Sequence, residues 1–205
     1  LYIFEYNILF IFSILGMMIM VSANDLMLLY LAIELQSLSL YVLVALKRDS
    51  VRASEAALKY FLLGSLASCI FVYGIALIYV SLSIIGVYET SIAISFIGPE
   101  NVPLTTLVGL ILIIVGLLFK VAAAPFQAWA PDVYQGSPTG YVGYMATVAK
   151  VSSFIVLARL VAVSLTFIID QFDLFFGAVV ILSVLAGALF AANQSDLKRL
   201  IAYSG

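Results

Sequence analysis

The sequence of 205 residues has very few charged side chains. Asp, Glu, Lys and Arg make up only 10% of it, whereas hydrophobic residues make up 65%. Soluble domains carry about 25% charged residues. So few charges cannot cover a water-exposed surface, and the composition therefore predicts a polytopic membrane protein. The formal net charge of −2 also provides no basic surface for nucleic acid, so we expect no nucleic-acid partner.

Residues that bind metals or redox cofactors are scarce as well. The chain has no histidine, and Cys69 is its only cysteine. An intrachain disulfide is therefore impossible, and the usual ligands of haem and iron–sulfur centres are missing. The sequence also lacks a glycine-rich phosphate loop and a Ser/His set suited to hydrolysis. We therefore expect no cofactor and no metal site in this chain.

Long apolar runs are what the chain does have. A membrane-spanning helix needs about 20 largely apolar residues, and the stretches that qualify are 3–22, 26–46, 55–80, 104–130, 139–164 and 172–193. A seventh is expected to begin near Leu197, and the polar segment 81–103 is expected at the membrane interface or as a short surface helix. The fold class is therefore all-α, a single polytopic transmembrane helix bundle over residues 1–205. Because both ends of the sequence have helical character, we expect it to be part of a longer subunit.

Basic residues gather in two segments that six alternating spans place on one side of the membrane. Segments 47–54 and 194–199 carry them, namely Lys47, Arg48, Arg52, Lys198 and Arg199. The links 22–25, 81–103 and 165–171, expected on the other side, carry no Lys or Arg. The positive-inside rule therefore predicts that the basic side faces the cytoplasm or the mitochondrial matrix.

Four of the ionisable residues within the predicted spans are candidates for a functional role: Glu34, Lys59, Lys120 and Lys150. A charge inside the bilayer is costly and therefore marks a candidate functional site. Burial favours the neutral form of an amine, whereas a nearby carboxylate favours the charged form. A buried lysine near a glutamate can therefore take up and release protons, and we interpret the four residues as a proton relay. The structural alternatives are static buried pairs and, for Lys59, an amine that reaches the membrane surface.

Pro125 stands five residues after Lys120. Proline lacks an N–H group, so a helix at this point loses its hydrogen bond to the carbonyl of Val121. A backbone group freed inside the membrane must be satisfied by protein or water, and interrupted helices form hydrated ion sites in transporters. The sequence therefore predicts that helix 104–130 is broken at Pro125 and hydrated beside Lys120. A kink without a functional role is the alternative.

The charged residues lie in segments with a distinctive combination of motifs. These are "NDLMLLYLAIELQSLSLYVLVAL", "EAALKYFLLGS", "GLLFKVAAAPFQAWAPDVYQGSPT", "MATVAKVSSF" and "NQSDLKRLIAYSG". Together they resemble the antiporter-like subunits of respiratory complex I, which are related to subunits of multi-component cation/proton antiporters. "APDVYQGSPT" is most similar to the N-type branch. The resemblance carries the relay of the family over to Glu34, Lys59, Lys120 and Lys150, although Gln127 stands where the family often has histidine.

The resemblance implies an antiporter-like, inverted-repeat fold with a discontinuous helix, of which this chain covers part. It implies proton translocation by a subunit of the H⁺-translocating NADH:ubiquinone reductase, driven by quinone reduction elsewhere in the complex. No redox chemistry and no cofactor are expected in this chain, because FMN, iron–sulfur clusters and quinone belong to other subunits. The expected partners are other membrane-arm subunits of complex I, including neighbouring antiporter-like subunits, and the lipid bilayer. The expected location is the mitochondrial inner membrane, with the bacterial plasma membrane as the alternative.

Two other functions remain open at this stage. The chain could belong to a Na⁺/H⁺ antiporter without redox drive, or it could be a structural membrane subunit with vestigial charges. The relay hypothesis makes two geometric predictions. Glu34 and Lys120 should face each other closely enough to pair directly or through one water, because each charge is costly alone. A polar, hydrated line should join Lys120 to Lys150.

Overall fold

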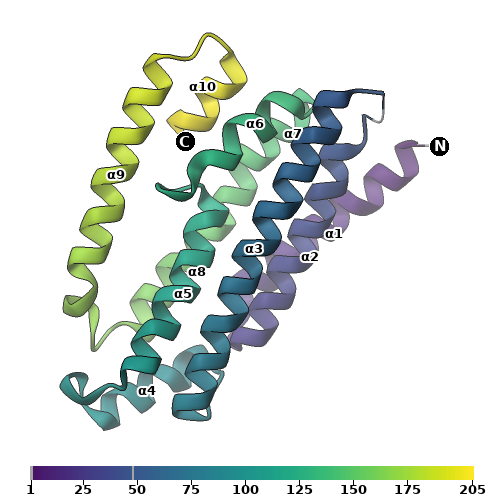
Figure 1. Cartoon of the computed structure of the whole chain (residues 1–205). Helices are drawn as coiled ribbons and strands as arrows, with labels where there is room; N and C mark the ends of the chain where they lie inside the picture. The colour runs from purple at the N-terminus through teal and green to yellow at the C-terminus, as the bar shows by residue number, and fades with distance from the viewer. Residues whose placement is uncertain (1, 48) are drawn as a thin grey trace.

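The computed structural model describes residues 2–47 and 49–205 and is helical throughout (Figure 1). Within these residues the only β-type pairing is an isolated bridge between Asp25 and Gly86. The helices in chain order are α1 (Tyr2–Ser22), α2 (Leu26–Ala45), α3 (Val51–Leu82), α4 (Val87–Ile97), α5 (Leu104–Val121), α6 (Trp129–Gly136), α7 (Thr139–Tyr144), α8 (Lys150–Ser164), α9 (Asp173–Ala192) and α10 (Leu197–Ser204). The predicted all-α fold class is confirmed.

Six helical segments in the described part of the chain are long and apolar enough to cross a membrane. They are Phe4–Ser22, Leu26–Ala45, Val51–Leu82, Leu104–Gly136, Thr139–Ser164 and Ile169–Ala192. The third begins earlier than residue 55 because the Ser50 side chain caps it, accepting a hydrogen bond from the backbone N–H of Ala53 at 3.3 Å. The fourth extends beyond residue 130 because the chain resumes as a second helix after the break. The molecule is a multi-pass membrane protein.

The polar segment between α3 and α5 folds into the short helix α4, which lies across one end of the bundle (Figure 1). Its buried face, which includes Val87 and Ile94, packs against α8. The hydroxyl of Ser164 also donates a hydrogen bond to the carbonyl of Val87 at 3.2 Å. At 11 residues α4 is too short to span a bilayer, so it closes this end of the bundle instead.

The two basic segments lie together at the opposite end. The link between α2 and α3 and the start of α10 both lie at the end of the bundle away from α4 (Figure 1). Lys47 and Arg52 flank that link, and Lys198 and Arg199 belong to the first turn of α10. Arg48 lies outside the described residues. We call this the basic end of the bundle.

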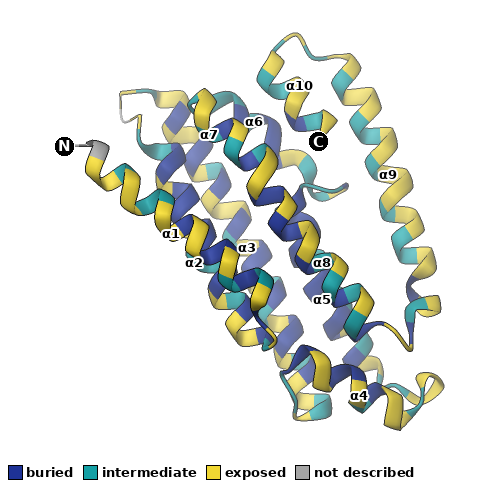
Figure 2. Ribbon diagram, turned by 180° about the vertical axis from the view of Figure 1, so that it is seen from behind, coloured by how far each residue is buried: buried dark blue, intermediate teal, exposed yellow. Residues whose placement is uncertain are grey.

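The helices of the bundle pack closely, except for α9. Its described residues include none that is buried, and the ribbon coloured by burial shows α9 standing apart from the others (Figure 2). By contrast, α3 and α5 approach each other at two glycines. A Cβ atom added to Gly74 would lie 2.7 Å from the carbonyl oxygen of Gly109, and one added to Gly109 would lie 2.9 Å from that of Gly74. This contact holds α5, and with it Lys120, against the rest of the bundle.

Gly74→Ala is therefore expected to destabilise the bundle. The added methyl group meets backbone atoms that cannot move aside, and such overpacking costs about 1–3 kcal/mol. The measurement is the thermal unfolding midpoint of the purified protein in detergent. Gly177→Ala in α9 is the matched control, because a Cβ there meets nothing within 4 Å. Equal midpoints for the two variants would show that the α3–α5 contact is not as tight as described.

Candidate functional site

The break in the fourth span has a more elaborate structure than a proline kink. Helix α5 ends at Val121, and Ala122 then adopts a left-handed conformation with φ 60°. The amide of Ala123 bonds back to the carbonyl of Leu118 at 3.0 Å, which closes the end of the helix in a Schellman-type turn. The predicted break at Pro125 thus begins at Ala122, and it is a complete stop rather than a bend.

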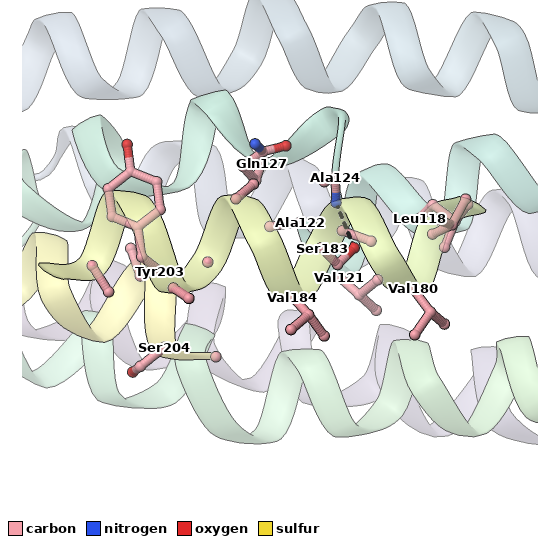
Figure 3. A pocket seen from close by; sticks show the side chains of 18 of the residues that line it. Leu118, Val121, Ala122, Ala124, Gln127, Val180, Ser183, Val184, Tyr203 and Ser204 are labelled. Carbon is pink, nitrogen blue, oxygen red and sulfur yellow. Dashed lines mark hydrogen bonds between the residues drawn. The ribbon is translucent and has the colours of Figure 1, made fainter. Parts of the chain in front are cut away.

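Side chains satisfy backbone groups that the break frees. The indole Nε1 of Trp129, at the start of α6, donates to the carbonyl of Phe119 at 3.0 Å. The amide of Ala124 donates to the hydroxyl of Ser183 on α9, also at 3.0 Å (Figure 3). Such partners are required because a freed backbone group inside a membrane is costly when it has none.

A cavity of about 680 Å³ lies between the break, α9 and α10. Most of the residues in its wall are apolar, and several of them are small, including Ala122, Ala124 and Gly187. Gln127 and Tyr203 add polar groups to the same wall (Figure 3). The side-chain oxygen of Gln127 is buried and has no hydrogen-bond partner among the described residues. The break is therefore flanked by open space that contains a polar group.

Lys120 lies in the last turn of α5, one residue before the helix ends. Its amine donates a hydrogen bond to the hydroxyl of Ser37 on α2 at 2.6 Å. The C-terminal end of a helix carries partial negative charge, which favours a cation there. The break therefore places the ammonium group where the backbone itself helps to stabilise it.

Glu34 lies one helical turn from Ser37 on the same face of α2. Its carboxylate accepts a hydrogen bond from the hydroxyl of Ser68 on α3. Among the described residues no ion pair joins Glu34 to Lys120. The direct form of the predicted pair is therefore not formed here, and a contact through one water stays a prediction. Instead, the Ser68 hydroxyl on α3 holds the carboxylate of Glu34, and the Ser37 hydroxyl, one turn along α2 from Glu34, holds the amine of Lys120.

Lys59 has a different environment, near the basic end. Its amine forms ion pairs with Glu55 and with Asp132 of α6, each at 2.8 Å, and its side chain is 43% exposed. Asp132 also pairs with Arg199 of α10 at 3.3 Å. These groups line a polar cavity of about 330 Å³ that also includes Arg52 and Gln135. Lys59 therefore belongs to a partly exposed network that connects α3, α6 and α10.

The start of α10 is fastened to the same network. Asp196 caps the helix by accepting a hydrogen bond from the amide of Lys198 at 2.9 Å, and Gln135 donates to its other oxygen at 3.0 Å. The bond from the Lys198 amide, followed by that from Gln135, lowers the pKa of the Asp196 carboxyl below its usual value. Because the pKa of Asp196 is lowered in the folded state, its cap stabilises the fold above pH about 3.9, the ordinary pKa of an aspartate. This stabilisation is lost as the pH falls through the folded pKa.

Lys150 is 6% exposed and begins α8. The residues just before it, Met145–Ala149, form a π-helical turn that interrupts the span Thr139–Ser164. Such turns are rare and occur frequently at functional sites. No hydrogen bond in the described part of the chain joins Lys150 to Lys120. The hydrated line between the two lysines thus stays a prediction.

The structure adds partners that sequence reasoning did not identify. Ser37 and Ser68 hold the two mid-membrane charges, and Asp132 connects Lys59 to α10. Of these three residues, only Ser37 could have been found from the sequence, because it follows Glu34 by three residues and so shares its helix face. The described residues contain no cluster of His, Cys, Asp and Glu that could hold a metal ion.

Comparison with known proteins assigns these helices and charges to a family. The family described as "NADH:quinone oxidoreductase/Mrp antiporter, TM" matches residues 23–205. The chain belongs to this family. A relative named NADH-quinone oxidoreductase subunit N from Maricaulis maris (strain MCS10) is 46% identical over 200 residues, which is 98% of this chain and 41% of the relative. The subunit N of Rhodobacter capsulatus is 44% identical over 201 residues, again 98% and 41%.

Solved structures of the family agree with the fold. A chain of respiratory complex I from Thermus thermophilus with bound aureothin matches with a TM-score of 0.81 and 40% identity, over 98% of this chain and 42% of that one. A chain of the Mrp complex from Dietzia sp. DQ12-45-1b gives a TM-score of 0.81 at 22% identity, over 95% and 36%, and at this identity it supports the fold alone. The predicted antiporter-like fold is confirmed.

The chain spans about two fifths of the length of these relatives, as the coverage of 41% for both subunit N proteins shows. The family assignment therefore applies to the helices described here. The activity of the whole protein is a separate inference.

Proposed function

We propose that this chain is part of the N-type subunit, subunit 2, of an NADH:quinone oxidoreductase, and that it carries protons through the membrane. One observation carries the proposal. Lys120 lies in the last turn of the broken helix, and its amine is bonded to Ser37, which is one turn from Glu34 on the facing helix α2. An acid and an amine so placed can transfer a proton between them inside the bundle. Lys150 and Lys59 are proposed to extend the relay on either side.

The relatives favour this function over a Na⁺/H⁺ antiporter. The subunit N proteins are 42–46% identical to this chain, whereas the Mrp chain is 22% identical. The redox-driven function therefore rests on sequence similarity as well as fold. We infer that the partners are other membrane-arm subunits and that FMN, iron–sulfur clusters and quinone lie in other subunits. The relatives named above are bacterial, which favours the bacterial plasma membrane over the mitochondrial inner membrane, with the basic end in the cytoplasm.

The proposed mechanism uses the two hydroxyl-bound charges as a switch. With Lys120 bonded to Ser37 and Glu34 bonded to Ser68, the two charges form no ion pair, and each has one hydrogen bond to a hydroxyl. A shift of the amine toward the carboxylate would stabilise the ammonium form, and a shift back would favour release of its proton, since burial disfavours the charge. The stop at Ala122 leaves the end of α5 free of a continuous helix, so this end can move by the small distance required.

The test is to purify the full-length subunit by an affinity tag from its own membranes. We expect flavin- and iron–sulfur-containing subunits to co-purify, and we expect NADH oxidation to drive proton uptake into inverted vesicles. A quinone-site inhibitor should stop both the NADH oxidation and the proton uptake. Sodium-gradient-driven proton movement in the absence of NADH, with no redox subunits in the preparation, would instead identify a Na⁺/H⁺ antiporter.

A further inference from the structure

A line of polar positions follows the contact between α2 and α3. Glu34, Ser37 and Tyr41 share one face of α2 because they are three and four residues apart. The facing positions on α3 are Ser68 and, one turn away, Gly64. The two helices pack directly on each other. We call this line the α2–α3 seam, and it begins at the proposed Glu34–Lys120 switch.

Tyr41 is the buried member of the seam that has no partner. Its side chain is 5% exposed, and its hydroxyl has no hydrogen-bond partner among the described residues. A buried polar group without a partner is uncommon and requires an explanation, most often a water molecule. The hydroxyl lies against the backbone of α3, because a Cβ added to Gly64 would be 1.9 Å from it. Glycine at this position therefore makes room for the hydroxyl.

The seam continues toward the basic end. Tyr41 meets the ring of Tyr60 edge-on, with ring centroids 4.6 Å apart. Tyr60 directly follows Lys59, whose amine lines the polar cavity with Asp132 and Glu55. Tyr41 thus contacts the residue that follows Lys59, and it lies one helical turn from Ser37, whose hydroxyl holds Lys120. Elsewhere around Tyr41 the packing is aromatic, including Phe61 at 5.8 Å.

From this geometry we infer that the Tyr41 hydroxyl is a proton-relay group on the uptake route from the basic end to Lys120. Protons collected at the Lys59–Asp132 cavity reach Tyr41 through water, and the hydroxyl passes them on to the Ser37–Lys120 pair. A hydroxyl suits this step because it donates one hydrogen bond while it accepts another. The inference deepens the proposed function and rests on it, since it supplies the path by which the switch is recharged.

The test is Tyr41→Phe in the full-length subunit within the assembled complex. NADH-driven proton uptake into inverted vesicles, per amount of complex, should fall about tenfold. This is less than the 10²–10⁴-fold that a positioned proton donor typically contributes, because water can partly replace one hydroxyl. Lowering the pH of the medium, which bathes the cytoplasmic side, should partly restore the rate because proton supply has become limiting. A merely structural defect would not respond in this way.

Tyr134→Phe is the matched control, because Tyr134 is also buried with an unpartnered hydroxyl but lies on α6. It should pump at the normal rate. If Tyr41→Phe pumps normally while Glu34→Gln fails, the inference about Tyr41 is wrong and the proposed function stands; if both pump normally, the proposed function fails as well. Should Tyr41→Phe not assemble, Gly64→Ala gives the same test, since its methyl group must displace the Tyr41 hydroxyl. Normal uptake by that variant would equally overturn the inference.

Discussion

Glu34→Gln is expected to abolish NADH-driven proton pumping while the complex still assembles. The change keeps the size of the side chain and its ability to accept a hydrogen bond from Ser68, but it removes the charge. Lys120 then loses the nearby carboxylate that favours its protonated form, and burial leaves the neutral amine preferred. The amine rests neutral and cannot cycle. Assembly should survive because Lys120 can avoid an unpaired buried charge by losing its proton.

The measurement is proton uptake and NADH oxidation in inverted vesicles at matched amounts of assembled complex. Pumping should fall by at least about a hundredfold, as expected when a positioned proton-transfer group is removed. Quinone reduction should slow with it if coupling is tight. Glu100→Gln is the matched control, because Glu100 is exposed in the link before α5. Normal pumping by Glu34→Gln would show that the glutamate–lysine switch does not operate in this protein.

Lys120→Arg is expected to stop pumping as completely as Lys120→Met. Arginine keeps a positive charge and can still donate to Ser37, so a static structural role would be preserved. Its guanidinium does not release a proton in proteins, however, and so it cannot serve as a relay. The same vesicle assay applies, with Lys47→Arg and Lys47→Met as controls at an exposed position. Pumping retained by Lys120→Arg would mean that Lys120 serves only as a fixed charge.

The double variant Glu34→Gln/Lys120→Met extends this test. If the two residues form one switch, the double variant should pump little worse than either single variant, because each change alone already disables the unit. Losses that multiply would instead place Glu34 and Lys120 on separate paths. This outcome would favour two independent proton routes through the bundle.

Much of the architecture follows from the sequence because it depends on local chain chemistry. Apolar runs of bilayer length predict the spans, and the polar 81–103 segment predicts an element that does not cross the membrane. The lysine at residue 120 and the proline at residue 125 predict a broken helix beside a buried charge. These are properties of consecutive residues, and no distant contact is needed to recognise them.

The tertiary structure decided what each charge contacts. The sequence predicts that Glu34 and Lys120 both lie within membrane spans, but side-chain partners depend on helix rotation and on the distances between helices. Those are set by packing, such as the Gly74–Gly109 approach that brings α5 onto α3. The result is that hydroxyls hold both charges, and that Lys59 pairs with Asp132, 73 residues away.

The sequence by itself therefore determined the membrane class, the helices and the residues whose charges are costly to bury. Their composition and order along the chain are enough for that, because a bilayer excludes charges and unpaired backbone groups whatever the packing. Only the tertiary structure decided that Tyr41 faces Gly64 and that α10 is fastened to α6. Those features depend on close contacts between helices far apart in the sequence, and spacing along one helix carries no information about them.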